Sequence, residues 1–108
     1  MKNAKYTIEM LQLSNEKTPF KQWVNSLDSS HTAIVFGRIE RVRNGLFGDC
    51  KSVGRGVFEL RIKVGPGYRV YFGIHKSSIV ILISGGDKSS QKRDILKAQS
   101  FWRSWEEE

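Results

Sequence analysis

Hydrophobic and polar side chains alternate along residues 58–75, and this pattern predicts a β-hairpin. Every second residue of 58–64 and of 68–74 is apolar, which is typical of strands that bury one face. Gly65-Pro66-Gly67 lies between the two runs and supplies the turn. The simplest register is a three-residue loop that is closed by Val64 opposite Tyr68.

The other face of this hairpin gathers charged residues. In the register above, Lys63 lies opposite Arg69 and Arg61 lies opposite Tyr71, while Glu59 is the acid on the same face. Like charges directly opposite each other destabilise a sheet. Two interpretations follow: a solvated strand surface, or a face that binds an anion.

Two helices are predicted before the hairpin. Thr18-Pro19 has the form of a helix start, with Thr as the N-cap and Pro at the first position. Apolar residues then recur at i, i+3, i+4 and i+7. A second helix is expected from about His31 to Asn44, with Gly45 as its stop. Its expected buried row is Val35, Ile39, Val42 and Leu46.

The remaining pattern completes an α+β chain. Residues 6–13 form a first strand, residues 45–56 a loop or irregular edge strand, and residues 78–84 an apolar strand buried on both faces. The last helix begins near residues 87–90. The order β-α-α-β-β-β-α predicts a small, mainly antiparallel twisted sheet. We expect the first strand to return beside the other strands. We also expect helices on one face and the charged face left partly open.

Composition narrows the class of protein. The 108 residues suggest one domain, 1–108, and the formal net charge of +7 suggests a polyanionic partner such as nucleic acid. No apolar run is long enough to span a membrane, and residues 1–6 lack a secretory signal, so we expect a cytoplasmic protein. The single Cys50 excludes an internal disulfide. His31 and His75 have no zinc-ligand spacing with other residues, so no metal is expected.

A second candidate cluster runs from Gly85 to Gln91, where a strand passes into a helix. Either Asp87 or Ser89 caps the helix, or the glycines and Lys88 receive a phosphate at the helix N-terminus. Antiparallel pairing should bring this segment beside Tyr68 and Arg69. Arg61, Arg69 and Lys88 would then converge on one phosphate and could stabilise a phosphoryl transition state without a metal.

The chain resembles the addiction-module killer proteins of the RelE/ParE/HigB superfamily of bacterial and phage toxins. The resemblance covers nearly the whole chain, in order. Its motifs are Asn44-Gly45-Leu46-Phe47-Gly48-Asp49, Phe58-Glu59-Leu60-Arg61-Ile62, Gly65-Pro66-Gly67-Tyr68-Arg69-Val70-Tyr71-Phe72, and Gly85-Gly86-Asp87-Lys88-Ser89-Ser90-Gln91 with Asp94-Ile95 and Ala98.

The resemblance implies a RelE-like fold and a toxin that a small antitoxin neutralises, often one with a helix-turn-helix domain. It also implies a ribosome-dependent endonuclease that cuts mRNA by attack of the 2′-OH, without a cofactor, in the cytoplasm of a bacterium. By position, Arg69, Lys88 and Arg61 match the family's basic site residues, and Glu59 is a candidate proton acceptor that would need a raised pKa. Further contacts to RNA phosphates are expected from Lys63, Tyr71, Lys51, Arg55 and Ser89.

The chain departs from this pattern in two places. Some RelE-type enzymes carry a tyrosine or a histidine–tyrosine pair where this chain has Asp87-Lys88-Ser89, and their C-terminal chain is shorter. Two alternatives therefore stay open. One is a ParE-like inhibitor of DNA gyrase without nuclease activity, and the other is an inactive relative that binds antitoxin.

Overall fold

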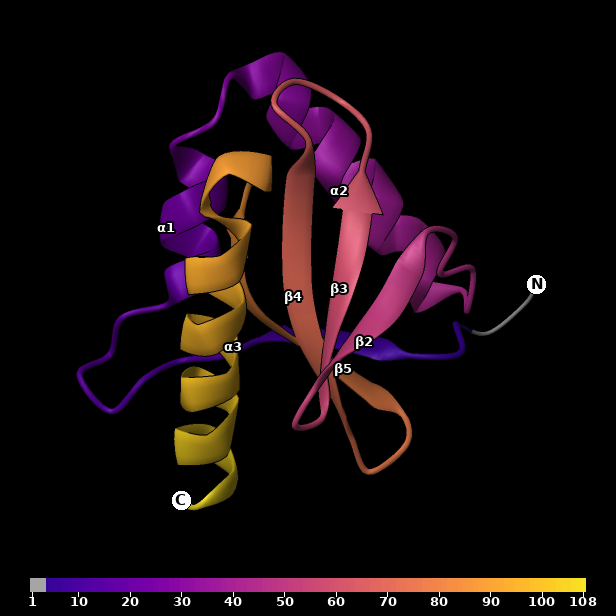
Figure 1. Ribbon diagram of the computed structural model, residues 1–108. Coiled ribbons are helices and arrows are strands. Elements are labelled where there is room, and N and C mark those ends of the chain that lie inside the picture. The colour runs from indigo at the N-terminus through magenta and orange to yellow at the C-terminus, as the bar shows by residue number, and fades with distance from the viewer. Residues whose placement is uncertain (1–3) are drawn as a thin grey trace.

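A computed structural model describes residues 4–108 and, within them, a five-stranded mixed sheet and three α-helices (Figure 1). Residues 1–3, which form half of the segment inspected for a secretory signal, lie outside the described residues. No helix of residues 4–108 is both long enough and apolar enough to cross a membrane. The elements in chain order are β1 (Thr7–Met10), α1 (Pro19–Asn25), α2 (Ser29–Arg43), β2 (Cys50–Gly54), β3 (Val57–Ile62), β4 (Tyr68–His75), β5 (Ile79–Gly86), the 3-10 turn η1 (Lys88–Ser90) and α3 (Gln91–Glu106).

The strands lie in the order β1-β5-β4-β3-β2. β2, β3, β4 and β5 pair antiparallel with their neighbours, whereas β1 pairs parallel with β5. The return of the first strand beside the later ones confirms that expectation. The irregular segment 45–56 provides β2, a fifth strand at the edge of the sheet.

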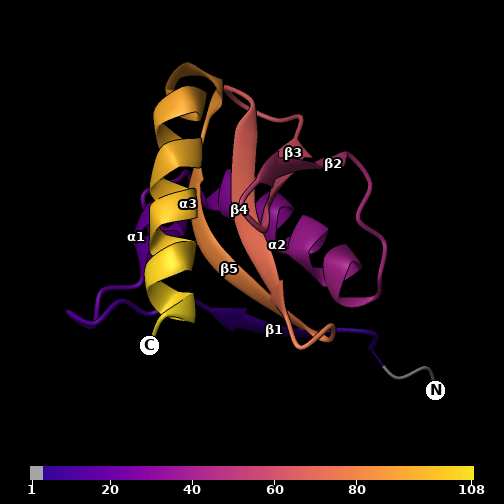
Figure 2. The same cartoon turned by 60° about the horizontal axis from the view of Figure 1, so that its bottom comes forward.

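Helices cover both faces of the sheet, as Figure 2 shows with α3 in front and α2 behind. The strand β5 alternates between two cores. Val80 and Leu82 pack with residues of α1 and α2, while Ile81 and Ile83 pack with residues of α3. The prediction of a strand buried on both faces is therefore confirmed.

The prediction that the helices lie on one face was wrong, because α3 packs on the charged face. That face is still partly open, as expected, since the Arg61 side chain is 35% exposed and Lys51 on β2 is exposed. The apolar stripe of α3 contains Ala98 and Trp102, which are both buried against the second face. A side chain at Gly73 would overlap the Trp102 ring, so this glycine lets α3 approach β4 closely. Ile81 and Ile83 on that face can be buried only because α3 packs over them.

The β3–β4 hairpin has a register two residues away from the expected one. Ile62 pairs with Tyr68 and Arg61 pairs with Arg69, so residues 63–67 form the loop. Gly65 and Gly67 adopt left-handed backbone angles, with φ of 56° and 81°. A shift of two residues leaves every side chain on its predicted face. Lys63 moves from the strand into the loop, and Val64 packs against the core.

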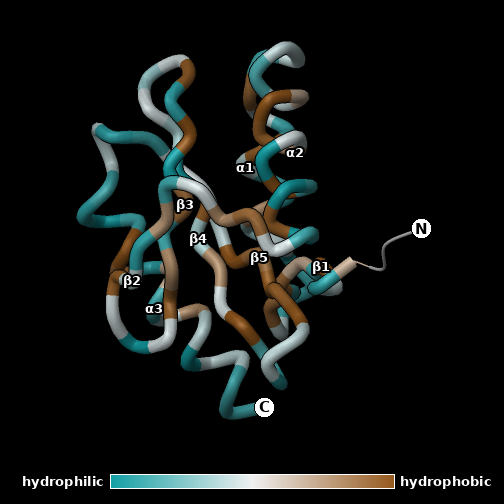
Figure 3. The backbone as a smooth tube through the Cα atoms, turned by 90° about the vertical axis from the view of Figure 1, so that its right-hand side faces the viewer, coloured by the Kyte–Doolittle hydropathy of each residue, from teal (hydrophilic) through white to brown (hydrophobic). Residues whose placement is uncertain are grey.

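Most of the other element ends follow the sequence signals. Asp28 caps α2 by accepting a hydrogen bond from the Ser30 amide, and Gly45 follows the helix with φ of 81°. Leu46 was expected in the buried row of α2, but it lies beyond the helix end and is 57% exposed. Figure 3 shows that the hydrophobic stretches concentrate in the central strands, while the chain is hydrophilic at its C-terminus.

Candidate phosphate-binding site

A buried carboxylate, Glu59 on β3, organises the charged residues of the sheet face under α3. Its side chain is fully buried. Oε1 accepts a hydrogen bond from Arg61 Nε at 3.1 Å, and Oε2 accepts from the Tyr71 hydroxyl at 3.2 Å and from Gln91 Nε2 at 2.9 Å. Arg69 Nε lies 3.7 Å from the same Oε2.

Strand pairing explains why these groups meet. Glu59 is directly opposite Tyr71, and Arg61 is directly opposite Arg69, on neighbouring strands. Two arginines in opposite positions repel each other, and a carboxylate on the same face offsets this repulsion. Gln91 reaches the cluster because α3 begins at the end of β5, which is the neighbour of β4.

The hydrogen bonds keep Glu59 ionised. Burial of the carboxyl group disfavours its charge, but donation from Gln91, Arg61 and Tyr71 outweighs burial and holds the pKa of Glu59 below its ordinary value. Burial and the adjacent Glu59 carboxylate raise the pKa of Tyr71 well above its ordinary value, so the phenol stays protonated. The raised pKa that a proton acceptor at Glu59 would need is therefore absent.

The two arginines turn the same edge of the guanidinium group toward Glu59. Arg61 Nε donates a hydrogen bond to the carboxylate, whereas Arg69 Nε faces it at 3.7 Å without a hydrogen bond, and Arg69 Nη1 donates to the Gly67 carbonyl oxygen at 2.8 Å. In the described part of the chain, Arg61 forms no hydrogen bond through its terminal nitrogens, and its side chain is 35% exposed. Those terminal N–H groups can donate hydrogen bonds to a phosphate from solvent.

The backbone of Arg61 is held from both sides. Its amide donates to the Asp49 carbonyl oxygen at 2.9 Å, and its carbonyl accepts from Arg38 Nη2 at 3.3 Å. Asp49 comes from the loop before β2, and Arg38 comes from α2 on the other face of the sheet. These bonds fix the position from which the Arg61 side chain projects.

Lys88 lies next to Arg69. Arg69 pairs with Gly86 across β4 and β5, which confirms the predicted proximity of the two chain segments. A Cβ atom at Gly67 would lie 3.5 Å from Arg69 Nη1 and 3.6 Å from Lys88 Cβ. Lys88 is exposed, so an anion in front of Arg61 and Arg69 can also reach its ammonium group.

Asp87 caps the 3-10 turn η1, which leads into α3, whereas Ser90, the N-cap residue of α3 itself, makes no side-chain cap hydrogen bond. Asp87 accepts hydrogen bonds from the amide and the hydroxyl of Ser89, and these bonds lower the pKa of Asp87. The adjacent glycines serve packing. A side chain at Gly85 would overlap the Trp23 ring, and one at Gly86 would overlap the Asp94 carboxylate on the opposite face.

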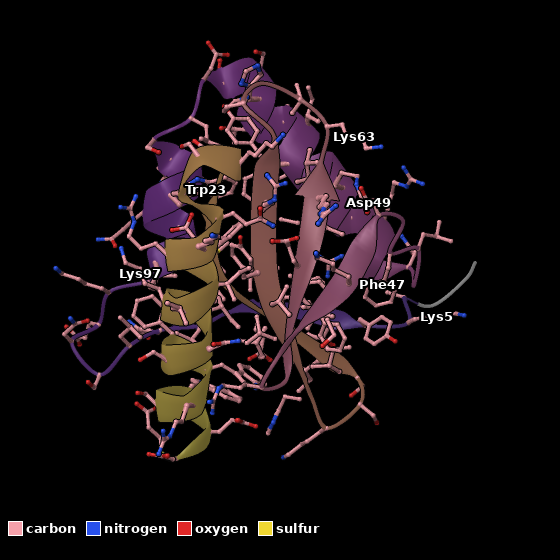
Figure 4. The ribbon with its side chains drawn as sticks, viewed as in Figure 1. Lys5, Trp23, Phe47, Asp49, Lys63 and Lys97 are labelled. Carbon is pink, nitrogen blue, oxygen red and sulfur yellow. The ribbon has the colours of Figure 1, made fainter. Side chains whose placement is uncertain are left out.

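The other expected contacts are spread over the molecule. Lys51 is exposed on β2 directly opposite Glu59, and Lys63 is exposed in the hairpin loop, where Figure 4 labels it. Tyr71 is fully buried, so it supports Glu59 and does not reach solvent. Arg55 lies in the β2–β3 turn at the far end of β3, roughly 20 Å from the hairpin loop at about 3.3 Å per residue. The Ser89 hydroxyl is bonded to Asp87.

Two residues were missed as parts of this region. Gln91 was named only as the last residue of the second candidate cluster, although its position in the first turn of α3 places it close to Gly86, the residue that pairs with Arg69. His31 was expected only as the start of the second predicted helix and not as a zinc ligand, but it is half-buried, with Nδ1 2.8 Å from the Tyr68 hydroxyl and its ring against Gly65 of the hairpin loop. Its i, i+4 spacing with Val35 places it beside the buried row of α2 and could have revealed this.

The sequence matches a family of phage-derived proteins. The model of the phage-derived Gp49-like proteins (DUF891) matches residues 22–100, a range that includes every residue of the Glu59 cluster. A protein of Haemophilus influenzae that is described as uncharacterized is 47% identical over 81 residues, which cover 74% of this chain and 82% of the relative. The chain belongs to the phage-derived Gp49-like family (DUF891).

Proposed function

We propose that this protein is the toxin of a type II toxin–antitoxin module and that it cuts mRNA on the ribosome. The observation that carries the proposal is that the buried Glu59 lies within ion-pair distance of both Arg61 and Arg69, while Lys88 lies beside Arg69 at the same end of the sheet. Membership of the Gp49-like group, which is associated with toxin–antitoxin modules, supports the same conclusion.

The proposed reaction is an internal transfer of a phosphoryl group in RNA. The 2′-oxygen forms a bond to the adjacent phosphorus while the bond from phosphorus to the 5′-oxygen breaks. The 2′-OH loses its proton and the departing 5′-oxygen gains one, which gives a 2′,3′-cyclic phosphate and a 5′-hydroxyl end. Negative charge builds on the phosphoryl oxygens during this step, and fixed cations stabilise it most effectively where no reorganisation is needed.

The cluster is suited to this stabilisation. Arg61 offers its terminal N–H groups, Arg69 is nearly buried at 8% exposure, and Lys88 adds a mobile ammonium group at the rim. Glu59 is a positioning residue in this scheme. Its carboxylate is fully buried and already accepts three hydrogen bonds, so it orients the arginines and does not take the 2′-proton.

The proposed partner in the cell is a small antitoxin that binds the folded toxin and neutralises it. The strongly basic chain, with a net charge of +7, supports an acidic partner as well as RNA. Co-purification from cells that express this chain together with the adjacent reading frame tests this part of the proposal. Failure to recover a complex would contradict it.

Primer extension on translating ribosomes tests the proposed reaction. The purified protein should create new mRNA ends at the ribosomal A site, and the 3′ fragment should carry a 5′-hydroxyl group. No ends above background would overturn the endonuclease proposal. A parallel assay of DNA supercoiling by gyrase distinguishes the endonuclease from the ParE-like alternative. Only a ParE-like protein would inhibit gyrase while leaving mRNA intact.

A further inference from the structure

The outer face of α3 carries cations that the reaction scheme above does not use. Lys92, Arg93 and Lys97 are all exposed, and together they form what we call the α3 ridge. Figure 4 places Lys97 on the side of α3 that faces away from β2 and β3. The ridge starts one helical turn after Lys88.

Unlike Arg43 and Arg103, these cations have no acidic partner among residues 4–108, a property that they share with the exposed Arg41 and Arg55. Arg43 pairs with Glu40 at 3.0 Å, and Arg103 pairs with Glu107 at 3.0 Å. Across residues 4–108, no ion pair involves a residue of the α3 ridge. The nearest acid in sequence, Asp94, turns inward, where its carboxylate accepts a hydrogen bond from Ser90.

The arrangement works against the stability of α3. Lys92 and Arg93 stand in the first turn, where a positive charge opposes the helix dipole, and Arg93 and Lys97 are like charges at i, i+4. The exposed acids Glu106–Glu108 lie at the opposite end, where the dipole disfavours them. Such a conflict between local charge and local structure is typical of a binding surface.

The ridge follows Lys88 along the chain. From Lys88 to Lys97 the chain advances about 14 Å at about 1.5 Å per residue. Leu96 is 67% exposed among these cations, so an apolar contact surface is interleaved with positive charge. Apolar and cationic groups in alternation match an RNA strand, which presents ribose and base between phosphates.

We infer that the α3 ridge is a second RNA-binding surface that holds the RNA backbone beyond the phosphate bound at Arg61, Arg69 and Lys88. The inference rests on the proposed function for the identity of the polyanion. Its contribution is electrostatic and depends on the release of counterions from the RNA.

Binding of a single-stranded 2′-O-methyl RNA, which cannot undergo 2′-OH attack, tests the ridge by fluorescence anisotropy across a salt series. A triple variant, Lys92→Gln with Arg93→Gln and Lys97→Gln, should bind at least tenfold more weakly near 0.1 M salt. Its slope of log affinity against log salt should be about 2 units shallower, at about 0.7 counterion per phosphate contact.

A second triple variant is the matched control. Lys5→Gln with Lys21→Gln and Lys76→Gln removes the same charge from exposed positions on other elements and should retain affinity within about twofold. Equal weakening of the two triples, or an unchanged slope for the ridge triple, would overturn the inference. The two proposals fail separately: absence of mRNA cleavage by the unaltered protein refutes only the nuclease, and unimpaired RNA binding by the ridge triple refutes only the ridge.

Discussion

Glu59 shows how one buried acid can define a cationic site. Without it, Arg61 and Arg69 would face each other across two strands with nothing to offset their repulsion. With it, Arg61 is hydrogen-bonded at Nε and Arg69 has an opposite charge 3.7 Å from its Nε, and the terminal N–H groups of Arg61 are left for a ligand. A buried carboxylate with several donors is costly to remove, because the remaining charges lose their partner.

The pKa of Glu59 leads to a prediction about stability. Because that pKa is lower in the folded protein, ionised Glu59 stabilises the fold above its ordinary pKa, and this stabilisation is lost as pH falls through the folded pKa. Glu59→Gln should lower the free energy of unfolding at pH 7 by about 2 kcal/mol. Urea unfolding measures the change.

The same experiment at lower pH supplies the control. The difference between Glu59→Gln and the unaltered protein should shrink as the carboxyl group takes up its proton. A difference that is constant between pH 7 and pH 3 would show that the charge of Glu59 contributes nothing.

The alternating pattern of β3 and β4 allowed the sequence to place Glu59 and Arg61 on one face. It could not reveal their mutual distances, nor the two-residue difference in register, because loop closure by Gly65 and Gly67 allows more than one length. Gln91 escaped attention since only tertiary packing brings α3 over β3.

At the scale of helices and strands, the junction of β5 with α3 is packed so closely that two of its residues have room only for glycine. Gly85 makes room for Trp23 of α1, and Gly86 makes room for Asp94 of α3, on opposite faces of one strand. In one interpretation of the sequence, these glycines let a phosphate approach the backbone. In the structure, they make room for the side chains of neighbouring helices. The apolar run 79–83 predicted burial on both faces, and that burial already implied a second helical layer.

Gly85→Ala tests the packing role of this junction. Its Cβ would overlap the Trp23 ring, so the variant should lose about 2 kcal/mol of folding stability. Adding Trp23→Leu should recover part of the loss, because the smaller side chain relieves the overlap. Full stability in Gly85→Ala together with weaker RNA binding would favour close approach of a phosphate instead.

Gly37→Ala is the matched control for this substitution. Gly37 lies inside α2, and a Cβ atom there would meet nothing within 4 Å. Alanine has the higher helix propensity, so this variant should gain about 0.5–1 kcal/mol. Thermal melting of both single variants measures the contrast.

Across the whole molecule, charge is distributed unevenly between the ends of α3. The β3–β4 hairpin carries Lys63, the turn η1 carries Lys88, and the first half of α3 carries the α3 ridge, while Glu106–Glu108 stand at the other end of α3. A polyanion would therefore meet the molecule at the end that holds the Glu59 cluster. Net charge alone suggested a polyanionic partner, but only the fold shows where the unpaired cations collect.

The rate of mRNA cleavage on the ribosome under single-turnover conditions tests the proposed role of the cation cluster most directly. Arg61→Ala, Arg69→Ala and Lys88→Ala should each cut at least about 100-fold more slowly, as expected when a group that stabilises the transition state is lost. Lys21→Ala, a change at an exposed lysine of α1, should cut within about threefold of the unaltered protein. Unimpaired cleavage by folded Arg61→Ala and Lys88→Ala proteins would contradict the assignment of the site.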